Sequence, residues 1–234
     1  MKRFGNLLLL AVMTLAITSF FTSCEKDDVT PQSYFTADQN GYSQFNQNAL
    51  RTQLNSMAIE DLTAEEEAGL IFMREEEKLA HDVYIKLYET WGRQVFNNIA
   101  ASEQTHTEAV LLLLERYNLQ DPVGDNGVGV FVNADLQLLY DQLVARGNQS
   151  VEEAFRVGAA IEEIDILDLQ DQLTNVVDNQ DITLIYESLQ KGSRNHLRAF
   201  VRNMDNIGIT YAPEYLSQAE YDVIIAGDME NGPN

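Results

Sequence analysis

The sequence predicts an all-α protein: a four-helix bundle with one long crossover between its second and third long helices. Four long stretches contain no proline and carry hydrophobic residues at spacings of three and four, the pattern of a helix with one buried face. They cover roughly residues 64–90, 94–117, 151–175 and 182–204. No alternating strand pattern of useful length occurs, and the middle connection is much longer than the other two.

The first two long helices are expected to form an antiparallel pair. Thr63 and Glu66 have the spacing of a capping box, so the first helix should begin at Ala64. It continues without a break until Gly92. The second helix starts within a few residues of that glycine, and so short a turn brings two successive helices side by side.

A long connection leads from the second helix to the third. Residues 118–133 contain Pro122 and three glycines, which predicts a loop, and the amphipathic pattern of residues 134–146 predicts a short helix after it. The glycine-rich part lacks the lysine of a phosphate loop and the ordered acids of a calcium loop, so we assign it no ligand.

The third and fourth long helices form the second pair. Ser150 and Glu153 make another capping box at the start of the third helix. Gly192 is a local weakness in the fourth helix. The isoleucine-rich tail that follows, residues 207–234, is expected to pack across the bundle.

The N-terminus resembles a bacterial lipoprotein signal. Lys2 and Arg3 precede an apolar stretch too short to span a bilayer comfortably, and Cys24 follows small residues at its end, as in a lipobox. We expect an exported lipoprotein with Cys24 lipidated, held to the outer membrane or cell surface by its lipid anchor. An anchor on the periplasmic face of the membrane is an open alternative. An ordinary signal peptide followed by an incidental cysteine is the alternative.

The remaining boundaries follow from composition. Residues 24–60 are polar and rich in Gln and Asn, which predicts a tether with one short helix near residues 43–57. The expected organisation is a signal peptide at 1–23, a polar tether at 24–60, the helical bundle at 61–206 and a C-terminal tail at 207–234.

The composition excludes two functional classes. The 234 residues include 37 Asp and Glu against 15 Lys and Arg, a formal net charge of −22, which argues against nucleic acid as a partner because phosphates repel such a chain. A single Cys rules out a Cys-x-x-Cys zinc or redox motif. The acids do permit metal ions that prefer oxygen ligands.

Two histidine motifs suggest where a metal would bind. Glu103 and His106 form a Glu-x-x-His motif, and this spacing places both side chains on one helix face, within reach of one metal ion. His196 occupies the matching place in the fourth helix, although Ser193 stands where a second glutamate would be. Bundles of this kind build dinuclear metal sites from such motifs plus one Glu from each of the other two helices.

The other two long helices supply candidate carboxylates. Glu162 lies in an otherwise apolar stripe, where an isolated charge is too costly unless it is neutralised, paired or metal-bound, whereas Glu163 shares its face with polar residues. Asp165 is a candidate auxiliary ligand that would replace the oxygen missing at Ser193. Glu77 lies in the first helix at a depth similar to that of Glu103. We assign Glu75 and Glu76 to a solvated face.

Together, the stretches 73–80, 102–106, 161–165 and 192–196 resemble a prokaryotic ferritin-like family known mainly as a domain of unknown function, and the first of them also resembles rubrerythrins and bacterioferritins. The resemblance covers about residues 60–205 and implies a ferritin-like bundle with a dinuclear metal site. The metal ligands are then expected to be Glu77, Glu103, His106, Glu162, Asp165 and His196. Tyr84, Ser193 and His81 are expected beside the metals rather than as ligands.

The expected function is therefore metal binding, with iron as the cofactor and manganese or zinc as alternatives. Such a protein would oxidise Fe(II) or handle oxygen or peroxide, as a ferroxidase or a peroxide-reducing oxidoreductase. The alternative is a non-catalytic surface binding or scaffold module that keeps the bundle. The sequence leaves open whether the protein is an enzyme and whether it forms a homodimer.

Overall fold

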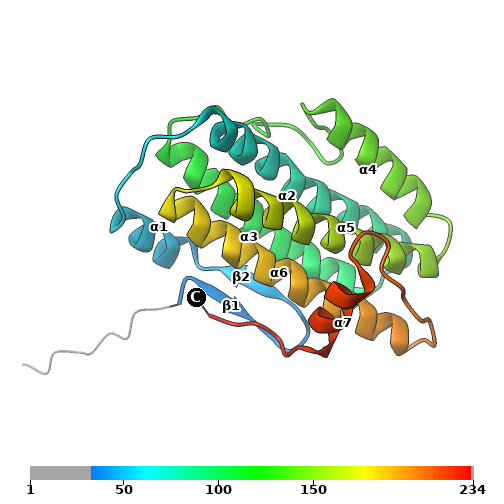
Figure 1. Cartoon of the computed structure of the whole chain (residues 1–234). Coiled ribbons are helices and arrows are strands. Elements are labelled where there is room, and N and C mark those ends of the chain that lie inside the picture. The colour runs from blue at the N-terminus through cyan, green and yellow to red at the C-terminus, as the bar shows by residue number, and fades with distance from the viewer. Residues whose placement is uncertain (1–32, 233–234) are drawn as a thin grey trace, which may run out of the picture. The chain divides into compact units, whose positions relative to one another are not determined.

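The computed structural model describes residues 33–232 and is predominantly helical (Figure 1). Four long helices lie side by side. Their bounds are α2 Ala64–Trp91, α3 Gln94–Arg116, α5 Val151–Asp171 and α6 Gln180–Asp205. The closest pairs are α2 with α3 and α5 with α6, and contacts of α3 with α6 and of α2 with α5 close the arrangement.

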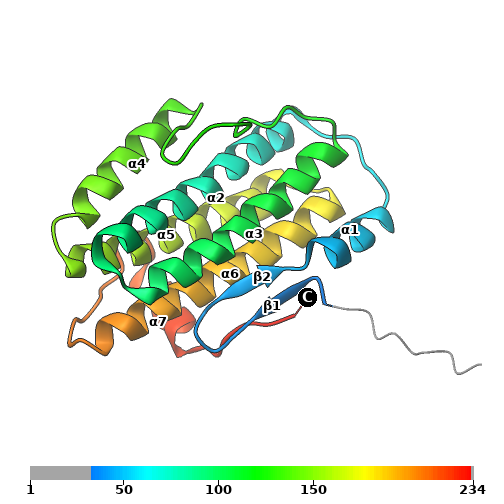
Figure 2. The same ribbon diagram turned by 180° about the vertical axis from the view of Figure 1, so that it is seen from behind.

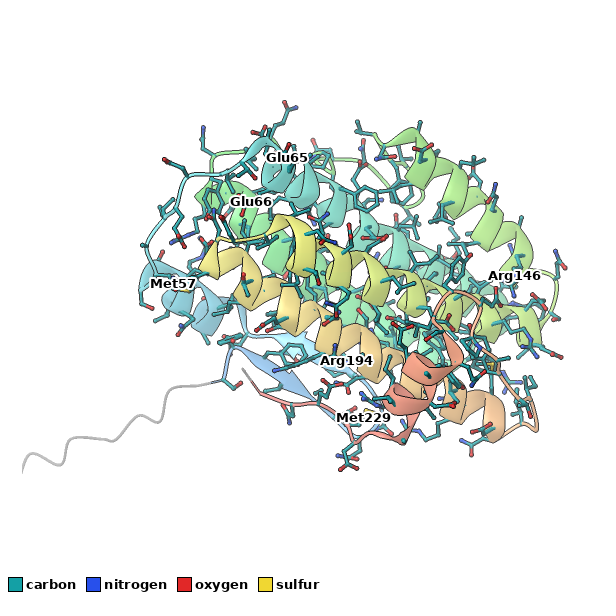
Figure 3. All side chains as sticks on the ribbon, in the orientation of Figure 1. Met57, Glu65, Glu66, Arg146, Arg194 and Met229 are labelled. Carbon is teal, nitrogen blue, oxygen red and sulfur yellow. The ribbon has the colours of Figure 1, made fainter. Side chains whose placement is uncertain are left out.

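Capping side chains determine where two of the long helices begin. Thr63 accepts a hydrogen bond from the backbone N–H of Glu66, and the Glu66 carboxylate accepts one from the N–H of Thr63, which completes the expected capping box. Figure 3 labels Glu66 at this end of α2. The Ser150 hydroxyl accepts from the N–H of Glu153 at the start of α5. A π-helical turn, η1 Gln172–Val176, ends the α5 segment.

The long connection between α3 and α5 is fastened to α2 by the buried carboxylate of Glu75. Helix α4, Ala134–Gly147, packs on α2 and α5. Just before it, the backbone N–H groups of Val132 and Asn133 donate to the two oxygens of Glu75, at 2.6 and 3.0 Å. Assigning Glu75 and Glu76 to a solvated face was therefore wrong, because both side chains are buried.

The segment before α2 differs from the expected polar tether. Strands β1 Phe35–Ala37 and β2 Ser43–Phe45 form an antiparallel hairpin, and helix α1 Gln47–Asn55 follows. The hairpin contacts α3 and α6, as Figure 2 shows from behind. Phe35 and Phe45 are buried among leucines of the long helices, so the hairpin contributes side chains to the core.

The chain after α6 is fastened back onto the helices. Helix α7, Gln218–Ala226, contacts α6. The buried Glu163 carboxylate accepts hydrogen bonds from the Tyr211 hydroxyl and from three successive backbone N–H groups, those of residues 214–216. Arg194, labelled on α6 in Figure 3, pairs with Glu230.

The expected signal peptide and Cys24 lie outside the described residues. Among residues 33–232, no helix is both long and apolar enough to cross a membrane.

Candidate metal centre

Four helices deliver acidic and imidazole side chains to one place inside the protein. Glu77 comes from α2, Glu103 and His106 from α3, Glu162 from α5 and His196 from α6. All five side chains are at most 2% exposed. The structure thus brings together five of the six residues that the sequence suggested as ligands.

Glu103 stands between the two histidines. Its Oε2 lies 2.8 Å from Nδ1 of His106, and its Oε1 lies 2.8 Å from Nδ1 of His196. Glu77 approaches Nδ1 of His106 at 3.4 Å, and Glu162 approaches Nδ1 of His196 at the same distance. The centre therefore consists of two similar halves that share one carboxylate.

Each half offers three ligand atoms to one metal ion. The atoms of Glu77, Glu103 and His106 lie within 4.8 Å of one another, and so do those of Glu103, Glu162 and His196. A carboxylate with two oxygens can bind one ion through each, so Glu103 is placed to bridge two ions.

Several polar atoms of this centre have no hydrogen-bond partner outside the centre itself. The unpartnered buried atoms are Nδ1 of His106 and of His196, both Oε atoms of Glu77, Oε1 of Glu103 and Oε2 of Glu162. Buried polar groups are normally hydrogen-bonded, and each one left unsatisfied costs about 1–3 kcal/mol. Unpartnered nitrogen and carboxylate oxygens that converge on two points fit two metal ions, because a metal would satisfy them all.

The histidines are held in a strongly acidic environment. Burial alone lowers a histidine pKa, but the negative charge of Glu103 outweighs it and raises the pKa of His106 to about 9. Burial is likewise outweighed at His196, where Glu103 and Glu162 raise the pKa to about 10. Without metal, both rings therefore carry a proton on Nδ1 at neutral pH, and a metal ion would replace that proton.

The three glutamates respond differently to the same burial. Burial raises the pKa of Glu77 and of Glu162 to about 7, despite the nearby histidines. Glu103 is equally buried, yet the positive charges of His196 and His106 hold its pKa well below its usual range. The carboxylate shared by the two halves is thus the one that stays ionised.

Tyr84 lies beside the centre, as expected. Its hydroxyl donates to Oε1 of Glu162 at 2.5 Å, which leaves Oε2 of Glu162 facing His196. Burial and the neighbouring acids raise the Tyr84 pKa well above its ordinary value, so the phenol stays protonated and remains a donor. This hydrogen bond holds the Glu162 carboxylate in one orientation.

Ser43 of β2 is a residue of this centre that the sequence did not reveal. Its hydroxyl oxygen lies 2.8 Å from Nε2 of His106 and 2.9 Å from Nε2 of His196. The two rings are stacked, with centroids 5.3 Å apart. No sequence signal marked Ser43, because it comes from a three-residue strand far from every motif.

Asp165 lies apart from both groups of three. It is buried beside Glu76, and the two line a cavity of about 10 Å³ with four aliphatic side chains. Burial raises the Asp165 pKa well above its usual value, and the charges of Glu76 and Glu162 add to the effect. Burial and the neighbouring Asp168 likewise raise the pKa of Glu76 well above its usual value.

The two remaining expected neighbours of the metals point elsewhere. Ser193 is buried, and its hydroxyl donates to the backbone carbonyl of Leu189 in its own helix. The Nδ1 atom of His81 lies 2.8 Å from Asp82. Together with Arg74 and Lys78, these two residues line a different cavity.

Comparison with known proteins identifies relatives with no stated activity. A family model described as an uncharacterised protein domain (DUF2202) matches residues 66–228. The uncharacterised protein MJ0754 of Methanocaldococcus jannaschii is 51% identical over 181 residues, which cover 77% of this chain and 97% of that protein. The fold is also similar to the crystal structure of the hypothetical protein MJ0754 from Methanococcus jannaschii, with a TM-score of 0.72 and 50% sequence identity. The match covers 74% of this chain and 99% of that chain. The family match begins after the hairpin and α1, so Ser43 lies outside it.

Proposed function

The chain belongs to the DUF2202 family, and we propose that it is a ferritin-like protein whose bundle binds two transition-metal ions, with iron as the metal. The observation that carries this proposal is the pair of three-ligand groups that share Glu103. The atoms that face each other in these groups, including Nδ1 of both histidines, are buried and have no hydrogen-bond partner outside the centre.

The connectivity of the helices supports the ferritin-like assignment. Two closely joined pairs, α2 with α3 and α5 with α6, are linked by one long connection. Ferritin-like bundles have one such crossover, and their dinuclear sites take ligands from all four helices. Here Glu77 and Glu162 come from one member of each pair, and His106 and His196 from the other.

The donor atoms favour a transition metal over calcium or magnesium. Imidazole nitrogen combined with carboxylate oxygen suits Fe(II), Mn(II) or Zn(II), whereas Ca²⁺ and Mg²⁺ prefer oxygen alone. The three carboxylates of Glu77, Glu103 and Glu162 balance three of the four positive charges of two divalent ions. The nearby Asp165 belongs to neither ligand group, and its raised pKa favours the uncharged form as long as no metal ion is near.

We assign each residue a role toward the metals. Glu103 would be shared by the two ions, Glu77 and Glu162 would each hold one of them, and His106 and His196 would each offer Nδ1 once that atom has lost its proton. Tyr84 holds Glu162 by a hydrogen bond. When bound, a pair of Fe(II) ions would supply electrons to oxygen or peroxide.

The activity that we propose is oxidation of Fe(II) or reduction of oxygen or peroxide. Because the sequence contains one Cys, it carries no cysteine-ligated iron module of its own, so repeated turnover would need an external reductant. Because the site is buried, bulk water would be excluded from the reaction.

Metal analysis tests this proposal. The protein is purified without an affinity tag and reconstituted with Fe(II) or Mn(II), and bound metal is counted. We expect about two ions per chain, almost none for Glu103→Ala, and at most about one for His106→Ala, because His106 belongs to only one of the two ligand groups. Wild-type protein that retains no metal, or variants that bind as well as the wild type, would overturn the proposal.

Activity assays separate an enzyme from a binding module. If two ions bind, and Fe(II) oxidation or peroxide consumption rises with bound metal, the protein is an oxidoreductase. If two ions bind and neither rate rises, the surface binding or scaffold role is the correct one. Ser193 favours that second role, because a full dinuclear motif would have a glutamate in its place.

We also propose that the protein is exported and lipidated at Cys24, as the sequence suggests. Labelling of the wild type but not of Cys24→Ala with a fatty-acid analogue in a bacterial host would support this. Equal labelling of both would contradict it.

A further inference from the structure

We propose that Ser43 is a positioning residue of the metal centre, which orients both histidines by accepting hydrogen bonds from their Nε2 atoms. This inference rests on the proposed metal-binding function and extends it to the N-terminal hairpin. The geometry that points to it is one hydroxyl oxygen within 2.9 Å of both rings, on the side opposite the metal-facing Nδ1 atoms.

A serine hydroxyl suits this role because of its hydrogen-bonding capacity. It offers two lone pairs and a single proton, so it can accept from two donors. A neutral imidazole that binds metal through Nδ1 carries its proton on Nε2. With metal bound, both rings are therefore Nε2–H donors, and the Ser43 oxygen can accept from both at once.

The position of Ser43 is built into the hairpin. The side chain is fully buried, and its backbone N–H donates to the Ser102 hydroxyl at 2.9 Å. Phe45, two residues on and on the same face, meets the His106 ring edge to face at 5.6 Å. These contacts fix the strand against α3, directly over the histidine pair.

Two glycines allow the hairpin to come this close. A Cβ at Gly41 would lie 2.6 Å from Cβ of Ala199, and its φ of +84° also favours glycine at this turn. A Cβ at Gly192 would lie 2.5 Å from Cε1 of His106 and 3.2 Å from the Ser43 oxygen. Gly192 therefore makes room for the ring and for the hydroxyl that supports it.

The arrangement matters for metal affinity because a buried Nε2–H without an acceptor is costly. Loss of a hydrogen-bond partner that orients a metal-binding histidine typically weakens metal binding about 10- to 100-fold. Here a single side chain serves two histidines in two half-sites. Removing it should therefore weaken both metal positions together.

Co(II) binding to the purified protein tests the inference, with Ser43→Ala compared with the wild type and with Gln44→Ala. Alanine keeps the backbone hydrogen bond of residue 43 to Ser102. Gln44 is the neighbouring residue on the exposed face of the same strand, so its replacement controls for general effects on the hairpin. The affinity is obtained by competition with a chelator, and folding is checked by circular dichroism.

A second readout reports directly on the hydrogen bonds. In the Co(II)-loaded protein, the two Nε2–H protons should give proton NMR signals that are shifted by the metal and exchange slowly with water. We expect Ser43→Ala to bind Co(II) about 10- to 100-fold more weakly at both positions and to show accelerated exchange of both signals. Gln44→Ala should match the wild type in both measurements.

The outcomes distinguish this inference from the proposed function. Wild-type protein that binds no Co(II) would refute the metal centre itself. Wild-type binding with unchanged affinity and unchanged proton exchange in Ser43→Ala would refute only the role of Ser43. If Ser43→Ala does not fold, Ser43→Cys answers the same question, because its thiol is a similar size but a weak acceptor.

Discussion

Oε1 of Glu103 lies 2.8 Å from Nδ1 of His196, although the whole crossover separates α3 from α6 in the chain. The other oxygen of the same carboxylate faces His106 at the same distance. One side chain therefore joins the two halves of the centre.

Glu103→Gln should abolish binding at both metal positions, because an amide carries no charge and cannot bridge two cations. We expect bound metal to fall from about two ions per chain to nearly none, measured by elemental analysis after Mn(II) reconstitution. Gln104→Ala is the matched control, since Gln104 is the next residue on α3 and is exposed. A variant that still binds one ion tightly would show that Glu103 serves only one half.

Tyr84→Phe should weaken one metal position and spare the other. The lost hydrogen bond to a charged carboxylate is worth about 1.5–3 kcal/mol, which corresponds to roughly a tenfold loss of affinity or more at the half containing Glu162. Stepwise Co(II) titration separates the two binding events. Tyr215→Phe, at a half-exposed position, is the control. Equal weakening of both events would mean that Tyr84 acts on the whole centre.

Asp165→Asn should leave two ions bound but reduce their affinity a few-fold. Asp165 belongs to neither ligand group, but its carboxyl group interacts with the charges of Glu162, Glu77 and Glu103. Two cations nearby would lower its raised pKa and favour its ionised form, which would then stabilise them. We expect unchanged stoichiometry by elemental analysis with a modestly weaker Mn(II) affinity. A drop to one ion per chain would instead make Asp165 a ligand, as the sequence had suggested.

The metal-free protein should lose stability as pH rises from about 6 to 10. Folding raises the pKa of His106 from 6.5 to about 9 and that of His196 to about 10, so their stabilising effect is complete below pH 6.5 and disappears as pH passes through 9 and 10. The pKa values of Glu77 and Glu162 are raised to about 7, so these two groups also cause a loss of stability as pH rises from 4.5 to 7. Glu103 acts oppositely, because its lowered pKa removes stability only as pH falls below about 4.5.

Metal binding should reverse this pH dependence, because metal replaces the Nδ1 protons. The difference in melting temperature between metal-loaded and metal-free protein should widen from pH 6 to pH 9. Differential scanning calorimetry measures both forms, with His81→Gln as a control, since His81 lies outside the centre. A difference that stays constant across this range would mean that binding displaces no proton.

The sequence predicted the long helices well, because local signals define them. The capping residue Thr63 and the terminal Gly92 give the first helix bounds within a residue of the observed Ala64–Trp91. The same signals predicted that the candidate ligands lie at one level along the helices. The position of each turn and the rise per residue determine how far from the turn each side chain lies. The observed spatial grouping of Glu77 and Glu162 with the two histidines matches that reasoning.

The hairpin and the roles of several acids could not be read from local patterns. Strands of three residues are too short for an alternating pattern to show, and Ser43 acquires its partners only through tertiary packing. Glu75 and Glu163 lie in runs of acids that look solvated, but each accepts backbone hydrogen bonds from a distant segment. Such partners depend on how loops return to the helices, which periodicity does not encode.

A crystal structure of the Mn(II)-reconstituted protein, with anomalous diffraction data, tests the central claim most directly. Two anomalous peaks are expected, one among Glu77, Glu103 and Nδ1 of His106, and one among Glu103, Glu162 and Nδ1 of His196. Absence of peaks at these positions, or a hydrogen-bonded Glu103 carboxylate with no ion beside it, would contradict the dinuclear metal centre.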